Sequence, residues 1–122
     1  MLWLSVLVGG AVGSVVRYGI GMWLNNATWP FGTWLVNALG SFLIGFLFVY
    51  GKEKMGLSPE AYLLWTTGFM GGFTTFSTFS LEVVQMILDG RIAVAILYSS
   101  ASVGAGIFCA YIGIAAARQL PL

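Results

Sequence analysis

Glycine, hydroxyl and phenylalanine residues that could contact a dehydrated ion are concentrated between positions 71 and 80. This stretch reads Gly71-Gly72-Phe73-Thr74-Thr75-Phe76-Ser77-Thr78-Phe79-Ser80. Its two glycines and its β-branched threonines disfavour a regular helix. The stretch lies inside an uncharged apolar run, 61–81. In a lipid bilayer, a break in the helical backbone is tolerated only where it is buried in protein or lines a polar cavity. We therefore interpret this stretch as the functional part of the chain.

Phe76 and Phe79 are three residues apart and so lie on one helix face, with Ser77, Thr78 and Ser80 on neighbouring faces. The common interpretation of such a pair in a membrane helix is contact with lipid or with the protein core. The alternative is an anion site, because the edge of an aromatic ring is partially positive and holds a small anion less tightly than a fixed cation would. The neighbouring hydroxyl groups would then replace part of the lost hydration.

Two other apolar segments carry polar residues at helical spacing. Asn37, Ser41 and Gly45 occupy positions i, i+4 and i+8, and the Asn37 amide can both donate and accept hydrogen bonds. Tyr98 and Ser102 are four residues apart on a later segment. Each set predicts either a polar track for an ion or hydrogen bonds that join helices and satisfy their backbone.

Arg17 and Glu82 are charged residues within otherwise apolar segments. An intramembrane arginine is costly and commonly functional, which favours an anion vestibule, but Arg17 could also extend to the membrane interface. Glu82 lies near the end of its segment. It is either at a pore mouth or at the level of the lipid headgroups.

Main-chain carbonyls of the interrupted stretch are a further set of possible ligands. An irregular backbone at 71–75 would expose carbonyl oxygens, and hard cations take oxygen ligands. Two antiparallel copies crossing at this point would supply carbonyls from both chains. A sodium-sized cation could then be held without any acidic side chain.

The composition places the chain in a membrane. It has 122 residues, of which 59% are hydrophobic and 7% are charged, whereas soluble domains carry roughly 25% charged residues. The net charge of +1 gives no indication of nucleic-acid binding. The chain has no histidine, the usual proton shuttle and metal ligand, and Cys109 is its only cysteine.

Charged and turn-forming residues divide the chain into four apolar segments that we expect to be transmembrane helices of a single all-α domain, 1–122. The expected spans are 2–24, 31–51, 61–88 and 92–117, with the third broken at the stretch described above. Ser58-Pro59-Glu60 has the pattern of a helix start, with a side-chain cap, proline and an acidic first turn. Small residues four apart, such as Gly9 and Gly13, predict close helix packing.

The basic residues give only a weak preference for one orientation. With four spans, Lys52, Lys54 and Arg118 share one side of the membrane, while the other side holds Arg91, plus Arg17 if it extends past the end of the first span. A weak bias permits insertion in both directions. Antiparallel assembly of identical chains therefore becomes possible.

The chain resembles the Fluc-type fluoride channels over essentially its whole length. Four motifs carry this resemblance: Gly9-Gly10-Ala11-Val12-Gly13-Ser14-Val15-Val16-Arg17-Tyr18, Gly32-Thr33-Trp34-Leu35-Val36-Asn37-Ala38-Leu39-Gly40, the 71–82 stretch ending in Ser80-Leu81-Glu82, and the segment from Tyr98 to Gly106. The resemblance implies a multi-pass protein of the cell (inner) membrane that passively exports fluoride and so relieves fluoride toxicity. In such channels fluoride enters as the neutral acid, is trapped as the anion at cytoplasmic pH and leaves down its gradient.

The resemblance also implies an antiparallel, dual-topology homodimer with two fluoride pathways, each lined by both chains. A structural sodium ion would lie at the dimer centre, held by main-chain oxygens of Gly71 and Thr74. Phe76 and Phe79 match the phenylalanine box, and Asn37 matches the pore asparagine that orients the rings and contacts the anion.

The remaining matches are polar or charged. The polar track of the family matches Ser77, Thr78, Tyr98 and Ser102. The family's vestibule carboxylate matches Glu82, and its arginine near the pore entrance matches Arg17.

Two other functions are compatible with a small four-helix membrane protein. A proton-coupled, antiparallel multidrug exporter requires an intramembrane carboxylate, and the first span has none. A non-transporting scaffold explains the glycines but gives no reason for a break in the third span. No enzymatic activity is expected.

Overall fold

The computed structural model describes residues 1–121, and its regular secondary structure in that range is helical throughout. Three helices are long and apolar enough to cross a membrane: α1 (Leu2–Leu24), α2 (Phe31–Val49) continued by the π-helical segment η1 (Tyr50–Lys54), and α6 (Ile92–Gln119). The expectation of an all-helical membrane protein is confirmed. The second and fourth spans extend two to three residues beyond their predicted ends.

Side-chain hydrogen bonds and one glycine shape the turns between these helices. Between α1 and α2, Asn26 Oδ1 accepts hydrogen bonds from the backbone N–H groups of Thr28 and Trp29, at 2.9 and 3.0 Å. After η1, Gly56 turns the chain with a φ of +62°, a value that glycine adopts without strain. Ser58 Oγ then accepts from the Ala61 N–H at 3.2 Å, so the predicted helix start is confirmed.

The chain between Pro59 and Leu88 is divided into four short elements. They are α3 (Pro59–Leu63), the π-helical segment η2 (Leu64–Met70), α4 (Gly71–Phe73) and α5 (Ser77–Leu88). Helical geometry is lost at 74–76, where Thr74 is extended with φ −89° and ψ 159°. We call residues 74–76 the interruption.

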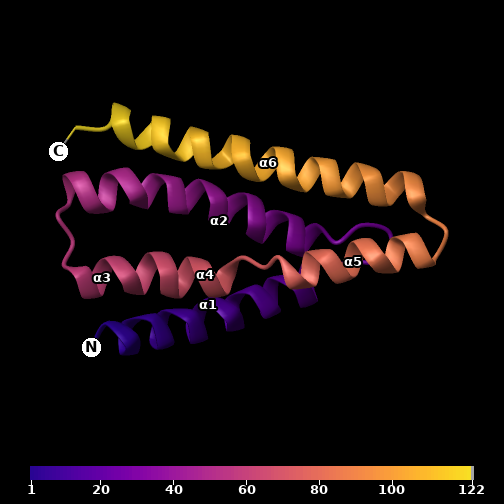
Figure 1. Ribbon diagram of the computed structural model, residues 1–122, viewed down its shortest axis with the longest axis horizontal. Coiled ribbons are helices and arrows are strands. Elements are labelled where there is room, and N and C mark those ends of the chain that lie inside the picture. Colours follow the sequence, from indigo (N-terminus) through magenta and orange to yellow (C-terminus); the bar gives the residue numbers. More distant parts are fainter. Residues whose placement is uncertain (122) are drawn as a thin grey trace.

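The helices lie side by side along one long axis (Figure 1). α2 packs mainly against α6, and α1 packs against η2 and α4. Both termini and the connection from η1 to α3 are at one end of the molecule, while the α5–α6 connection is at the other. Lys54 strengthens the first end, because its ammonium donates to the carbonyl of Ala117 at 2.8 Å.

Glycines allow the backbones to approach closely, as the small-residue spacing predicts. A Cβ atom on Gly13 would lie 2.2 Å from the Phe69 carbonyl oxygen, and one on Gly9 would lie 2.2 Å from that of Leu64. Between α2 and α6, a Cβ on Gly45 would lie 2.3 Å from the Ala110 oxygen. α1 can therefore occupy its place against η2 and α4 only if these positions lack side chains.

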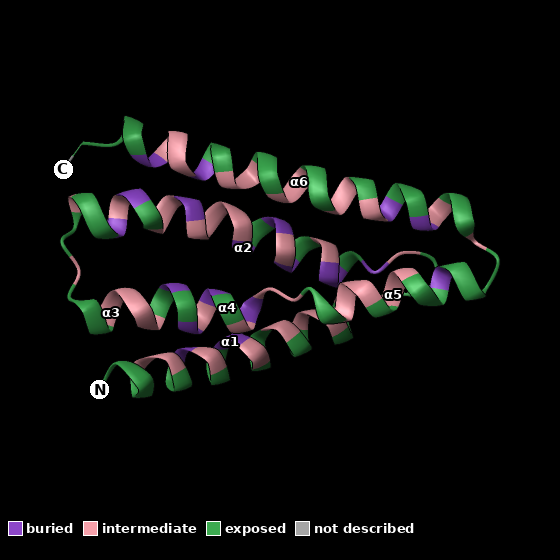
Figure 2. Cartoon of the chain, viewed as in Figure 1, coloured by how far each residue is buried: buried purple, intermediate pink, exposed green. Residues whose placement is uncertain are grey.

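Burial is restricted to the seams between helices (Figure 2). One core cluster contains Val36, Met70 and Phe73, and a second contains Met86, Ala95 and Tyr98. Large apolar side chains cover the outside, which suits a lipid solvent. Trp3 and Trp23, near the two ends of α1, are 91% and 81% exposed, as expected for aromatic residues at the two membrane interfaces.

Replacing Gly13 by alanine tests the close approach of α1. We expect Gly13→Ala to lower the free energy of unfolding by about 1–3 kcal/mol, because the methyl group would overlap the Phe69 backbone. Unfolding in detergent, followed by circular dichroism against increasing denaturant, measures this change. Gly19→Ala is the matched control, since a Cβ there meets nothing within 4 Å. Equal stability of the two variants would contradict the proposed packing.

Candidate ion pathway

The Asn37 side chain from α2 binds both backbone groups of Thr75 in the interruption. Asn37 Oδ1 accepts from the Thr75 N–H at 2.7 Å, and Asn37 Nδ2 donates to the Thr75 carbonyl at 3.0 Å. The Thr75 hydroxyl in turn accepts from the Thr78 N–H at 3.2 Å, in the manner of a helix cap for α5. The amide of Asn37 thus substitutes for hydrogen bonds that a continuous helix would have made.

Arg17 from α1 contacts the chain just before the interruption. Arg17 Nε donates to the Gly72 carbonyl at 3.0 Å, across 55 residues of sequence. Among the described residues this is the only hydrogen bond made by the Arg17 guanidinium. Arg17 is therefore placed against the α4 backbone two residues before the interruption, and its side chain is partly buried.

Three carbonyls around the interruption remain without a donor. In a continuous helix the carbonyls of Gly71, Phe73 and Thr74 would accept from N–H groups four residues later. Within residues 1–121, the hydrogen bonds of the structure do not reach these three oxygens. Gly71 and Thr74 also line the groove described next. The carbonyl oxygens of Gly71 and Thr74 are therefore available to a cation or to a hydrogen-bond donor.

A groove with a volume of about 840 Å³ runs past the interruption. It is lined from α2 by Asn37 and Ser41, from the interrupted segment by Tyr62, Thr66, Thr67, Gly71, Thr74, Thr75, Phe76 and Phe79, and from α6 by Ser102 and Gly106, together with apolar neighbours. None of the described residues lining it carries a formal charge. The groove is thus a neutral, mostly apolar passage with a few polar groups.

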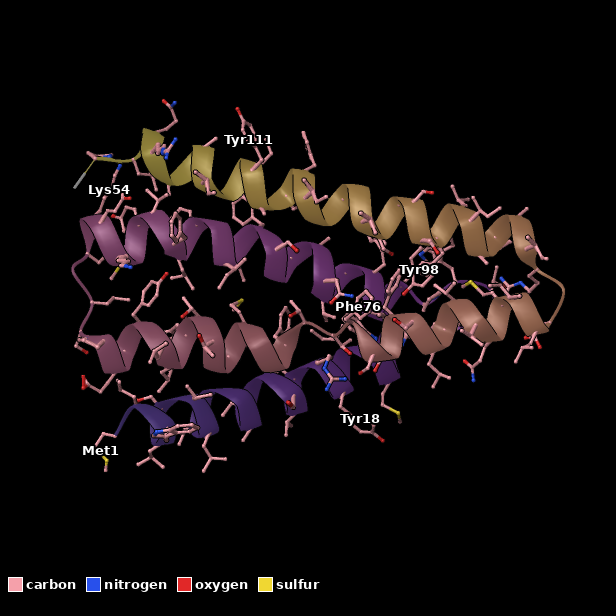
Figure 3. All side chains as sticks on the ribbon, viewed as in Figure 1. Met1, Tyr18, Lys54, Phe76, Tyr98 and Tyr111 are labelled. Atoms are coloured by element: carbon pink, nitrogen blue, oxygen red, sulfur yellow. The ribbon has the colours of Figure 1, made fainter. Side chains whose placement is uncertain are left out.

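Two phenylalanine rings form one wall of this groove. The ring centroids of Phe76 and Phe79 are 5.9 Å apart, and those of Phe79 and Tyr98 are 5.3 Å apart. Phe76, the last residue of the interruption, is 79% exposed in the single chain (Figure 3). The Ser102 hydroxyl is buried without a hydrogen-bond partner among the described residues. An unpaired buried hydroxyl is unusual and indicates a missing ligand, water molecule or partner.

Glu82 joins three helices by hydrogen bonds. Its carboxylate accepts from the Thr33 hydroxyl of α2 at 2.8 Å and from the Tyr98 hydroxyl of α6 at 2.7 Å. Thr33 also accepts from Asn25 Nδ2 at 3.3 Å, and Tyr98 is fully buried. We call Thr33, Glu82 and Tyr98 the carboxylate cluster. This cluster fixes α5, and with it the phenylalanine pair, against α2 and α6.

The structure thus divides the residues proposed from sequence into two groups. Asn37, Phe76, Phe79 and Ser102 line the groove, together with the expected cation ligands Gly71 and Thr74. The residues outside its lining are Ser77, Thr78, Tyr98, Glu82 and Arg17. Of this second group, Tyr98 contacts the groove indirectly through the Phe79 ring.

Two residues that interact with this site were not selected from the sequence. Thr33 lies four residues before Asn37 and so shares its helix face, which is a signal that periodicity provides. Thr75 offers its backbone and hydroxyl to Asn37 and Thr78. Its role depends on loss of helical geometry at one residue, and sequence does not resolve such a position.

These features define the class of the protein. It is an all-helical, multi-pass membrane protein with a neutral, mostly apolar groove at an interruption in a helical segment. Such a groove is suited to passing a small ion or solute, because carbonyl, hydroxyl and amide groups can replace hydration.

The comparisons with known proteins give the family. Residues 4–114 match the family described as "CrcB-like protein, Camphor Resistance (CrcB)", and the chain belongs to this family. A protein of Rhizobium meliloti named "Fluoride-specific ion channel FluC" is 42% identical over 120 residues, which cover 96% of each chain. "Fluoride-specific ion channel FluC 2" of Bacillus subtilis is 45% identical over 119 residues, covering 95% of this chain and 87% of that protein. The family resemblance expected from sequence is confirmed, and these relatives are channels rather than enzymes.

Removing the donors of the carboxylate cluster tests its role. We expect Thr33→Val and Tyr98→Phe each to lower the free energy of unfolding by about 1.5–3 kcal/mol, the range for hydrogen bonds to a charged group. The double variant should differ from the sum of the two, because both donors bind one carboxylate. Denaturant unfolding of the four proteins measures the coupling. Tyr111→Phe is the control, since Tyr111 is exposed and points outward (Figure 3). An effect of Tyr111→Phe as large as that of Tyr98→Phe would argue against the cluster.

Proposed function

We propose that this chain forms a fluoride-selective channel that passively exports fluoride across the cell membrane. The observation that carries this proposal is the neutral groove at the helix interruption, lined by the Asn37 amide, by hydroxyl residues and by two phenylalanines. The relatives share more than 40% sequence identity with this chain over most of its length, and their names support the same function.

Conduction requires the groove to compensate dehydration without binding the ion tightly. One N–H of the Asn37 amide is occupied by Thr75, and the second is free to donate to an anion. The Ser102 hydroxyl, buried without a partner in the described structure, supplies another donor. The ring edges of Phe76 and Phe79 add weak positive potential without a fixed charge. These groups stabilise a small dehydrated anion, but weakly enough for the anion to leave the groove again.

Selectivity against chloride would follow from size. A pathway narrowed by a second chain would admit a fluoride ion stripped of water, while a larger halide would need the phenylalanine wall to move. Protein interiors are close-packed, so such a displacement is costly. The absence of charge among the described lining residues avoids trapping the anion.

The functional unit we infer is an antiparallel homodimer of four-span chains. The segment from Pro59 to Leu88 runs alongside α2 and α6, as a fourth membrane-crossing element would (Figure 1). The basic residues Lys52, Lys54 and Arg118 lie at one end, and Arg91, which donates to the Ala27 carbonyl at 2.9 Å, lies at the other. So weak a bias of basic residues permits both orientations. A second copy facing the groove would complete the exposed wall at Phe76, giving two pathways, each lined by both chains.

A sodium ion fits the carbonyls that the interruption leaves without donors. Gly71 and Thr74 would hold it through their main-chain oxygens, and two antiparallel chains would supply four such ligands. When bound, the ion would neutralise carbonyl dipoles that are otherwise unpaired in an apolar environment. The described residues contain no group of three or more His, Cys, Asp or Glu side chains suited to a metal, so main-chain oxygens are the suitable ligands.

The alternative of a proton-coupled multidrug exporter is less well supported. Its transport site needs an ionisable carboxylate, whereas the groove lining has none among the described residues. Glu82, three residues after Phe79, is bound by two hydroxyl groups of the protein.

Fluoride efflux from liposomes tests the function. Purified protein reconstituted in liposomes should release fluoride rapidly and chloride negligibly, as measured with ion-selective electrodes. Replacing sodium by N-methyl-D-glucamine during purification and assay should reduce the fluoride flux. Absence of fluoride flux in sodium would refute the channel function, and sodium-independent flux would refute the sodium site alone.

Variants in the groove serve as internal controls for that assay. Phe76→Ile and Asn37→Asp should abolish fluoride flux while the dimer still assembles, because one removes a ring edge and the other replaces an amide donor by an acceptor. Phe108→Ile should retain flux, since Phe108 is exposed on α6 outside the groove lining.

Antiparallel assembly predicts that the C-terminus is found on both sides of the membrane. A cysteine-containing tag added there, in a Cys109→Ser background, should react with a membrane-impermeant maleimide to about half in intact vesicles and fully after permeabilisation. The proportion follows from equal insertion in the two directions. Labelling from one side only would exclude the antiparallel dimer.

A further inference from the structure

The glycine-lined face of α1 ends at Arg17. Gly9, Gly13 and Arg17 follow one another at intervals of four and so lie on one side of the helix. The two glycines bring the α1 backbone into contact with η2 and α4. The same face therefore delivers the guanidinium to the place where α4 ends.

The contact made there has the chemistry of a helix cap. In a continuous helix, the Gly72 carbonyl would accept from the N–H of Phe76, but the interruption removes this bond. Arg17 Nε donates to that carbonyl instead, at 3.0 Å. The carboxyl-terminal end of a helix carries partial negative charge, so a guanidinium is a suitable cap for it. The hydrogen bond is stronger than a neutral one because its donor is charged.

Arg17 and Asn37 hold the interruption from two helices. Arg17 fixes Gly72, two residues before it, and Asn37 fixes Thr75 within it. Among the carbonyls left without donors, that of Gly71 belongs to the peptide unit next to the Gly72 carbonyl, and that of Thr74 shares its peptide unit with the Thr75 N–H. Because each peptide unit is planar, fixing Gly72 and Thr75 restricts the directions in which these two carbonyls can point.

We propose that Arg17 is a positioning residue that caps Gly72 and thereby orients the carbonyls of Gly71 and Thr74 toward a cation. This inference rests on the proposed function, because the cation is the sodium ion proposed there. It assigns Arg17 a role other than electrostatic attraction of the permeant anion. The two roles predict different behaviour when the side chain is neutralised.

Hydrogen–deuterium exchange of the assembled protein in detergent, read by mass spectrometry, distinguishes these roles. We expect Arg17→Gln to raise exchange in the peptide covering 71–78 by about tenfold, because a charge-assisted hydrogen bond is lost. The sodium concentration that half-protects this peptide should rise by a similar factor. Arg17→Lys should be intermediate, since an ammonium keeps the charge but lacks the planar donor. Arg118→Gln is the matched control, because it removes a guanidinium that is exposed near the end of α6.

Wild-type exchange at 71–78 in Arg17→Gln, with an unchanged sodium midpoint, would overturn the proposal. Lower fluoride flux that is restored at high fluoride would then assign Arg17 to anion attraction. If Arg17→Gln does not assemble, Arg17→Lys decides: exchange at the wild-type rate would overturn the proposal. The exchange measurement does not require fluoride transport. If the wild-type protein showed no fluoride flux, the proposed function would be refuted, but the exchange measurement would still test the role of Arg17.

Discussion

The arrangement of this protein depends on the backbone groups that lose their helical partners at residues 74–76. An unpaired backbone group costs several kcal/mol in hydrocarbon, so an interruption can persist only if other parts of the chain supply hydrogen bonds. Asn37 supplies two for Thr75, and Arg17 supplies one for Gly72. The positions of α1 and α2 against the interrupted segment follow from this requirement. The glycines of α1 allow the Arg17 guanidinium to reach the Gly72 carbonyl, because a larger residue in their place would hold α1 too far away.

The same requirement separates the polar residues into structural and groove-lining sets. Arg17, Glu82, Thr33 and Tyr98 each make hydrogen bonds to other protein groups outside the groove lining. The groove is consequently left with groups that are polar but uncharged. A passage of this kind compensates dehydration modestly, which suits an ion that must be released on the other side.

The membrane class and the approximate spans could be predicted because both depend on local composition. Low charge, apolar length and the residues Ser58 and Pro59 act within one or two helical turns. The exact ends and local geometry of the helices could not be predicted from the sequence. The π-helical turns at Tyr50–Lys54 and Leu64–Met70 depend on how each helix packs against its neighbours, and no local residue pattern specified them. The interruption was expected, but not that helical geometry would fail only after Phe73.

The sequence by itself determined a helical membrane protein, its family, and a set of polar residues at helical spacing. Only the tertiary structure decided which of those residues face the groove and which are bound by the protein. The pairs Arg17–Gly72, Thr33–Glu82 and Asn37–Thr75 are separated by 55, 49 and 38 residues. Periodicity places a side chain on a helix face, but the partner that it meets depends on which helix is packed against that face.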